Sequence, residues 1–293
     1  MSIIQPKYNN GFWSRLRRLP RAWIGATMVA AMLLAAVFAP QIATAEPTFQ
    51  FRSGLSSLGT PLPPGGDFAF GTDNLGRDVL SRVLYGAQVS LFVSLVANTV
   101  AAVLGTIAGL AAGYYSGWVD ALLMRFTDVL LAFPAILLAL GLAAILRPSV
   151  GVVTIIITVI AWPGLARVVR SQTLVVRERD FIESARAVGA SNGYIIVRHI
   201  LPHVITITVI WATLSLASTV LLEASLSYLG LGIPPPTPSW GNMIADGQTY
   251  YRNAPWLILV PGTAILLTTL GFNLLGDAMR DALDPRTTQR ERH

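Results

Sequence analysis

The chain contains six long runs of apolar residues, separated by more polar segments. Each run is close to the length that a helix needs to cross a membrane. A hydrocarbon core of about 30 Å needs roughly 20 apolar residues in helical conformation. No run alternates polar and apolar residues with period two, which disfavours a transmembrane β-barrel. The fold class predicted is all-α and integral to the membrane, with six transmembrane helices. The predicted spans are 23–39, 90–112, 129–146, 150–166, 204–222 and 256–275.

Composition supports a membrane-embedded chain. Only 12% of the residues are charged and 53% are hydrophobic, whereas soluble domains usually carry about 25% charged residues. The chain has no cysteine, which excludes disulfides, thiolate metal ligands and a cysteine nucleophile. The net charge of +6 fits nucleic acid, anionic lipid or topology signals, so the positions of the charges must decide.

The basic residues gather on one side of the predicted membrane. If the N-terminus is cytoplasmic, sixteen of the 21 Lys and Arg residues fall in cytoplasmic segments and five in outer ones. Cytoplasmic loops carry an excess of Lys and Arg. We therefore expect both termini in the cytoplasm, and no nucleic-acid partner is needed to explain the charge.

The first apolar run allows two interpretations. Preceding arginines, the run itself and the following Ala43-Thr44-Ala45 together resemble a signal peptide with a cleavage site. The run is slightly long for that role, which favours a retained transmembrane helix. The mass of the mature N-terminus distinguishes the two.

Small residues recur every four positions along the second span, at Ala97, Ala101, Gly105, Gly109 and Gly113. This spacing forms a nearly straight stripe on a helix, and in lipid small residues let two backbones approach closely. The stripe therefore predicts a helix–helix contact, either within this chain or with a second membrane subunit.

Prolines predict several interruptions of the helices. Pro134 and Pro163 lie within or near the ends of the third and fourth spans, and each removes a backbone donor and favours a kink. Between the fifth and sixth spans, residues 234–238 contain four prolines and predict a stiff outer loop. Before the second span, Asp73 or Asn74 predicts the cap of a separate interfacial helix that ends near Leu84.

Few polar groups lie within the spans. Each either faces a transport pathway or makes a hydrogen bond between helices. Glu223 is an acid near a span, and buried acids are costly and often functional, but it also fits a position at the outer surface. The pathway candidates are Asn98, Ser215, Ser218, Thr219 and Glu223.

The loop at 167–203 is too long for a simple connector and too apolar for a disordered one. Asp180 predicts a helix N-cap, with Glu183 completing a pair that resembles a capping box. Gly189 suits the left-handed residue that ends this helix. Ser191 predicts the cap of a second short helix, and Pro202 suits the first turn of the fifth span.

The two short helices should each present one apolar side. The first carries small residues, so it fits either a groove on another protein or the lipid headgroups. The expected apolar sides are Phe181, Ala185 and Val188 on the first helix, and Ile195, Ile196 and Ile200 on the second.

The segment Glu183-Ser184-Ala185-Arg186-Ala187-Val188-Gly189, followed by Ile200-Leu201-Pro202, resembles the EAA loop of ABC importer permeases. That pattern is E-A-A, three residues, G, nine residues, I, one residue, L-P. Ser184 and His199 depart from it. In that family the loop is the coupling helix that docks into a cleft of the ATPase subunit. The resemblance implies ATPase coupling through Glu183, Ser184, Ala185, Arg186, Ala187, Gly189, Leu201 and Pro202.

Further segments extend the resemblance from about residue 70 to 286. Gly71-Thr72-Asp73, the run 76–82, the run 128–134, the run 223–232 and the tail 276–286 resemble the dipeptide/oligopeptide/nickel permease group, and in particular its second ("C") subunit. This implies a bacterial inner-membrane location and a peptide substrate, with nickel or another small solute as the alternative. A secondary transporter would need inverted repeats or a mid-membrane proton-relay acid, and the sequence shows neither.

The resemblance also implies partners. They are a second, homologous permease, two ATPase domains or subunits, and an extracytoplasmic substrate-binding protein, all assembled in membrane lipid. The only lysine is Lys7, outside any P-loop pattern, so ATP and Mg should bind the partner ATPase and no cofactor is expected in this chain. His199 and His203 have no third metal ligand nearby, and no catalytic constellation is evident.

The resulting domain organisation has five parts. They are a cytoplasmic segment at 1–22, the first transmembrane helix at 23–39, an extracytoplasmic segment with an interfacial helix at 40–89, a five-helix permease core at 90–276 that contains the coupling loop at 167–203, and a cytoplasmic tail at 277–293.

Overall fold

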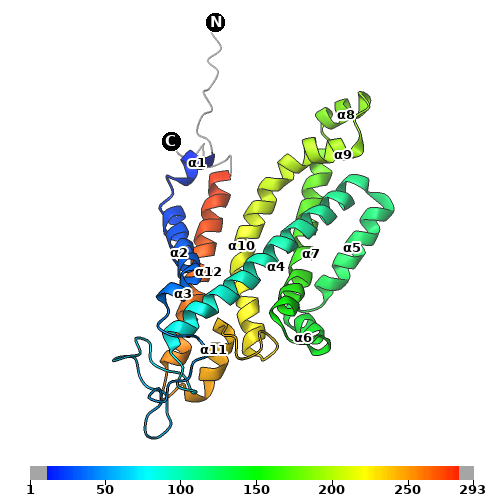
Figure 1. Ribbon diagram of the computed structural model, residues 1–293. Coiled ribbons are helices and arrows are strands. Elements are labelled where there is room, and N and C mark those ends of the chain that lie inside the picture. The colour runs from blue at the N-terminus through cyan, green and yellow to red at the C-terminus, as the bar shows by residue number, and fades with distance from the viewer. Residues whose placement is uncertain (1–11, 284–293) are drawn as a thin grey trace.

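The computed structural model describes residues 12–283, and every regular element in that range is helical (Figure 1). The predicted tail beyond residue 283 and the first eleven residues of the predicted N-terminal segment lie outside the described residues. Five unbroken helical stretches are long and apolar enough to cross a membrane. They are α2 (Pro20–Val37), α4 (Val79–Tyr115), α7 (Val150–Arg177), the run Asn192–Tyr228 and α12 (Trp256–Leu283).

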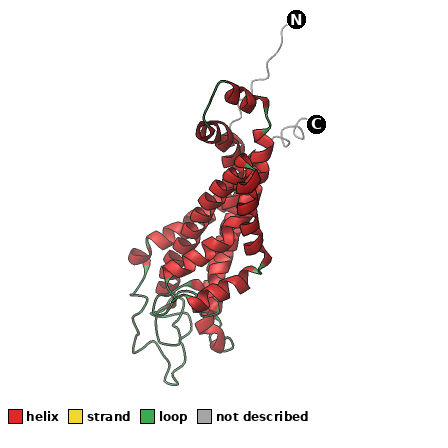
Figure 2. Cartoon of the chain, turned by 90° about the vertical axis from the view of Figure 1, so that its right-hand side faces the viewer, coloured by secondary structure: helices red, strands yellow, loops and turns green. Residues whose placement is uncertain are grey.

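Short helices occupy the two ends of the bundle. One end holds α1 (Phe12–Leu16), α8 (Asp180–Ala187) and the last turn of α12, and we call it the α8 end (Figure 1). The opposite end, the α11 end, holds α11 (Trp240–Gly247) and most of the irregular chain (Figure 2). Two further short elements are α3 (Ala39–Ile42) and the turn η2 (Gln248–Tyr250).

The third predicted span, 129–146, is wrong as a single helix. The chain forms α5 (Gly117–Ala132) and α6 (Ala135–Ile145), which meet at an angle of 92°. Phe133 adopts an extended backbone with ψ of 136°, as expected for a residue that precedes a proline. The apolar run alone could not place this corner, because both of its arms are apolar.

The separate interfacial helix expected from residue 73 or 74 to residue 84 is also wrong. Asp78 caps the helix instead, because its Oδ2 accepts a hydrogen bond of 2.8 Å from the Ser81 amide. The helix α4 then continues unbroken for 37 residues, or about 55 Å. Asp73 closes a turn outside the helix by accepting from the Leu75 and Arg77 amides.

The small-residue stripe of α4 packs against α7 within this chain. A Cβ on Gly109 would lie 2.6 Å from the Ala166 carbonyl oxygen, and a Cβ on Gly113 would lie 2.6 Å from the Thr173 Cβ. The two backbones therefore touch, and of the two interpretations of the stripe, the intrachain contact is confirmed.

The second short helix of the loop is not separate from the fifth span. The turn α9 (Asn192–Tyr194) leads through a π-helical turn, η1 (Ile195–Ile200), directly into α10 (Leu201–Tyr228). A π turn widens the hydrogen-bond register, and here it comes just before Pro202, which cannot donate a backbone hydrogen bond. The predicted apolar side is confirmed, since Ile195 and Ile200 are buried and Ile196 is half-buried.

Candidate translocation and coupling sites

Helix α8 lies beyond the ends of α7 and α10, in the segment of chain that connects them (Figure 1). The expected capping box at Asp180 is wrong, because the N-cap is Arg179 and no side chain caps the helix. Asp180 and Glu183 instead lie in the first turn, where negative charge interacts favourably with the helix dipole.

The end of α8 forms as its sequence predicts. Gly189 has φ of +82°, a conformation that favours glycine. The Gly189 amide donates to the Arg186 carbonyl at 2.9 Å, and the Ala190 amide donates to the Ala185 carbonyl at 3.0 Å, a pairing typical of helix C-termini. Ser191 then caps the next turn by accepting from the Tyr194 amide at 3.4 Å.

The inward side of α8 differs from the expected one. Ile182 is the fully buried residue, and Ala185 packs beside it against the same cluster as Ile195 and Ile200. Val188 is 84% exposed, so the prediction of Phe181, Ala185 and Val188 as the apolar side is wrong except for Ala185. The fold of the loop against η1, and not the helical periodicity, selects the buried residue.

Side-chain contacts join α8, α9 and α7 to the end of α4. The Arg186 guanidinium lies 5.6 Å from the centre of the Tyr114 ring, and the Tyr114 hydroxyl donates to Asn192 Oδ1 at 2.8 Å. Arg177, the last residue of α7, donates to the Gly113 and Tyr114 carbonyls at the end of α4. The Arg186 contact thus joins α8 to the end of α4, and the Arg177 contacts join that end of α4 to α7.

The coupling candidates form a mostly accessible surface. Ala185 and Leu201 are half-buried, and the other six are exposed. Phe181 of α8 stacks on His203 of α10, with ring centres 5.6 Å apart. The exposed candidates are Glu183, Ser184, Arg186, Ala187, Gly189 and Pro202.

A hollow of about 560 Å³ lies between α5, α6, α7 and α10. Three of the five pathway candidates line it: Ser215, Ser218 and Thr219. The Thr219 hydroxyl donates within α10 to the Ser215 carbonyl at 2.8 Å. Ser218 is exposed. The hollow is otherwise lined by apolar residues, so it provides a few hydroxyl groups on an apolar wall.

Asn98 and Glu223 do not line this hollow. Asn98 is buried and joins α4 to α10, since its Nδ2 donates to the Ala212 carbonyl at 2.8 Å and its Oδ1 accepts from the Ser215 hydroxyl at 2.6 Å. The side chain thus makes the interhelical hydrogen bond that was the alternative to a pathway role.

Glu223 is completely buried within the protein. The Ser227 hydroxyl donates to Glu223 Oε1 at 2.7 Å. The residue lies where α10 packs against α11, because a Cβ on Gly241 would lie 2.3 Å from the carbonyl oxygen of the neighbouring Ala224.

A charged network at the α11 end was not found by sequence reasoning. Arg77 and Arg82 are almost fully buried, and both contact Asp73, with Nε and Nη1 respectively 2.6 Å and 3.0 Å from its Oδ2. Arg82 Nη2 also lies 3.2 Å from Asp246 Oδ2 of α11. The spacing of Asp73 and Arg77 signalled a pair four residues apart, but nothing local pointed to Asp246, which is 164 residues from Arg82.

Replacing Asp246 by Asn should weaken the attachment of α11 to the start of α4. Asp246 is 41% exposed, so we expect a moderate loss of about 1 kcal/mol of stability. Thermal unfolding of the purified protein measures it, with Asp67→Asn on the same side as the control because Asp67 is exposed. Equal melting temperatures for the two variants would contradict the role of the network.

Two arginine–aspartate pairs connect α5 to α7. Arg170 donates to Asp120, with Nη2 2.6 Å from Oδ2, and Arg167 donates to Asp128.

Within residues 12–283, no group of three or more His, Asp or Glu side chains is placed to hold a metal ion.

Comparison with known families matches most of the chain. Residues 105–289 match the family described as binding-protein-dependent transport system inner membrane component. Residues 9–64 match the N-terminal TM domain of oligopeptide transport permease C, which favours the retained interpretation of the first transmembrane helix.

Related proteins align over nearly their whole length. A protein of Brucella suis biovar 1 named as a peptide transport system permease is 46% identical over 93% of this chain and 90% of its own length. The glutathione transport system permease protein GsiD of Escherichia coli O6:K15:H31 is 44% identical over 94% of this chain and 89% of its own.

Among solved structures, a chain of the MetNI methionine ABC transporter in an inward-facing conformation has the same fold. It superposes with a TM-score of 0.57 at 19% identity, covering 69% of this chain and 97% of that chain. The family match over 105–289, together with these relatives, shows that this chain belongs to the binding-protein-dependent transport system inner membrane components, the permeases of ABC transporters.

Proposed function

We propose that this chain is one of two permease subunits of an ATP-driven importer, and that the importer carries peptides. The observation that carries the proposal is that α7 and α10 line the hollow that contains Ser215, Ser218 and Thr219, and that the segment connecting these two helices carries the exposed helix α8. Relatives named for peptide and for glutathione transport support the substrate class, since glutathione is itself a tripeptide.

The hollow would form half of the translocation pathway. It is lined by α5, α6, α7 and α10, and a homologous permease facing it would provide the other half. Ser215, Ser218 and Thr219 would then offer hydroxyl groups to a passing peptide. An apolar wall with a few hydroxyls suits a substrate that must bind weakly enough to leave.

The direction of transport follows from the proposed orientation. The α8 end carries Arg177, Arg179 and Arg186 in or next to α8, and Arg167 and Arg170 lie in the last three turns of α7. This excess of basic residues favours a cytoplasmic position. The partner ATPases, which would bind ATP and Mg, would dock on α8. The α11 end would face the substrate-binding protein.

Coupling would run from α8 into the membrane. Closure of the ATPase pair would move α8, and the contacts of Arg186 with Tyr114 and of Arg177 with the end of α4 would pass that movement to α4, α7 and α10. The hollow on α7 and α10 would then change its access from one side to the other. A ligand or nucleotide shifts such an equilibrium only by its differential affinity for the two states.

Tagged protein isolated from native membranes provides the first test. We expect a second permease, P-loop ATPases and a binding protein in the purified complex, identified by mass spectrometry. Recovery of this chain alone, under conditions that preserve known ABC complexes, would contradict the importer. A complex that fails to transport labelled di-, tri- and oligopeptides would contradict only the substrate class.

Filling the hollow should block transport without blocking assembly. Ser218→Phe places a large ring among its lining residues, and we expect peptide uptake by reconstituted complexes to fall about ten-fold, which corresponds to about 1.4 kcal/mol. Ser225→Phe is the matched control, because Ser225 is also an α10 serine but does not line the hollow. Equal uptake by the two variants would argue against a pathway at this hollow.

A further inference from the structure

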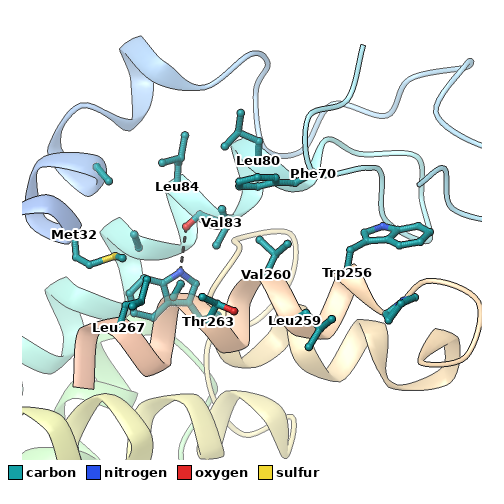
Figure 3. Close-up of a pocket in the computed structure, with 15 residues that line it drawn as sticks. Met32, Phe70, Leu80, Val83, Leu84, Trp256, Leu259, Val260, Thr263 and Leu267 are labelled. Carbon is teal, nitrogen blue, oxygen red and sulfur yellow. Dashed lines mark hydrogen bonds between the residues drawn. The ribbon is translucent and has the colours of Figure 1, made fainter. Parts of the chain in front are cut away.

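A second hollow opens between α2, α4 and α12, and it is separate from the proposed pathway (Figure 3). Its volume is about 540 Å³. Toward the α8 end, α2 and α12 touch, since a Cβ on Gly25 would lie 2.7 Å from the Leu275 amide nitrogen and 2.9 Å from the Gly271 carbonyl oxygen. The hollow lies beyond this contact, starting at Met32 and Leu267.

The walls of this hollow provide almost no hydrogen bonds. Apart from Thr263 and two tryptophans, every lining side chain is apolar. Both indole groups are already used, because Trp240 Nε1 donates to the Val83 carbonyl at 3.1 Å and Trp256 Nε1 donates to the Thr72 carbonyl at 3.2 Å. An occupant must therefore be apolar itself, since a buried polar group without a partner is costly.

The dimensions of the hollow match one leaflet of a bilayer. Its wall on α12 extends from Trp256 to Leu267, a rise of about 16 Å, and half of a hydrocarbon core is about 15 Å. A transmembrane helix of a partner would need a groove along the whole span, and the Gly25 contact closes this one. All three walls belong to helices that can cross a membrane, so lipid chains reach the opening.

We propose that this hollow holds one acyl chain of a phospholipid from the leaflet at the α11 end, which the proposed orientation makes the outer leaflet. Trp256, at the start of α12, stands at the level where tryptophans usually meet the headgroups. A chain gains no hydrophobic free energy by leaving the bilayer for an apolar hollow. Retention of the acyl chain therefore depends on its packing against the walls. A larger side chain that fills the hollow should remove the lipid.

The test uses the purified transporter complex and two variants on α12. Ala264→Phe fills the hollow, because Ala264 lines it, whereas Leu266→Phe adds a ring to an exposed position that does not line it. Native mass spectrometry after detergent washing counts the phospholipids retained. We expect the number of retained phospholipids to fall about ten-fold in Ala264→Phe, which corresponds to about 1.4 kcal/mol of binding free energy. The number should stay unchanged in Leu266→Phe.

Tryptophan fluorescence reports on the same hollow. In nanodiscs of phosphatidylcholine with brominated acyl chains, the bromines should quench the fluorescence of the buried Trp240. The part of the total quenching that comes from Trp240 is the difference in quenching between wild type and Trp240→Phe. We expect the quenching of Trp240 to be lost in Ala264→Phe and kept in Leu266→Phe. Ala35→Leu fills the hollow from α2 and replaces Ala264→Phe if the latter fails to assemble.

Two results would overturn the proposal. One is equal lipid retention by the filled and control variants. The other is a covalent crosslink from Ala264→Cys to a second protein chain of the complex, which would show that protein occupies the hollow. The native chain has no cysteine, so this engineered thiol is unique within it.

Discussion

Glu183→Arg is expected to reduce peptide uptake by the reconstituted transporter about ten-fold or more, which is at least about 1.4 kcal/mol of lost coupling. Glu183 is exposed in the first turn of α8. If α8 docks into the ATPase as proposed, reversing the charge places like or unpaired charge in the interface, and this costs several kcal/mol in protein–protein contacts. Uptake of a labelled peptide driven by ATP is the measurement.

The fold of the chain should survive this change. Reversing one charge near the start of a helix costs about 0.3–1 kcal/mol through the helix dipole, so the melting temperature should change little. Glu183→Gln keeps the shape and removes the charge, and it should lie between wild type and Glu183→Arg. Normal uptake by Glu183→Arg would remove the coupling role from this surface.

Gly109→Ala is expected to destabilise the protein, although alanine is the better helix former. The added Cβ would lie 2.6 Å from the Ala166 carbonyl oxygen and 2.6 Å from the Val169 Cβ, so α4 and α7 must move apart. Overpacking of this kind costs about 1–3 kcal/mol, against a gain in helix propensity of about 1 kcal/mol. The measurement is thermal unfolding of the purified complex.

Gly262→Ala supplies the matched control. Gly262 lies within α12, and a Cβ there meets no atom within 4 Å. This variant therefore keeps the propensity gain without the collision, and it should be neutral or more stable. If both alanine variants unfold at the same temperature, close contact between α4 and α7 does not depend on Gly109.

Local signals in the sequence were enough where the structure depends on a few neighbouring residues. Gly189 ends α8 with a left-handed backbone and Ser191 caps the next turn, because both effects act within one helical turn. The break in the helix at Pro134 was likewise predicted from the local sequence. Its angle of 92° was not predictable, because a proline only permits a break and packing sets the direction.

The apolar runs by themselves determined that the chain is a helical membrane protein, since hydrocarbon leaves few other ways to satisfy the backbone. They did not determine where helices begin and end outside the apolar runs. The helix α4 starts at Val79, eleven residues before the run that predicted it at residue 90, because membrane thickness limits only the apolar part of a helix.

Only the tertiary structure decided which groups meet. Ile182 is buried instead of Val188, Asp246 reaches Arg82, and Glu223 is enclosed where α10 meets α11. Each outcome depends on elements far apart in the chain, whose approach is set by the packing of whole helices. Periodicity describes the faces of a single helix, but the neighbour that covers a face is a property of the assembled bundle.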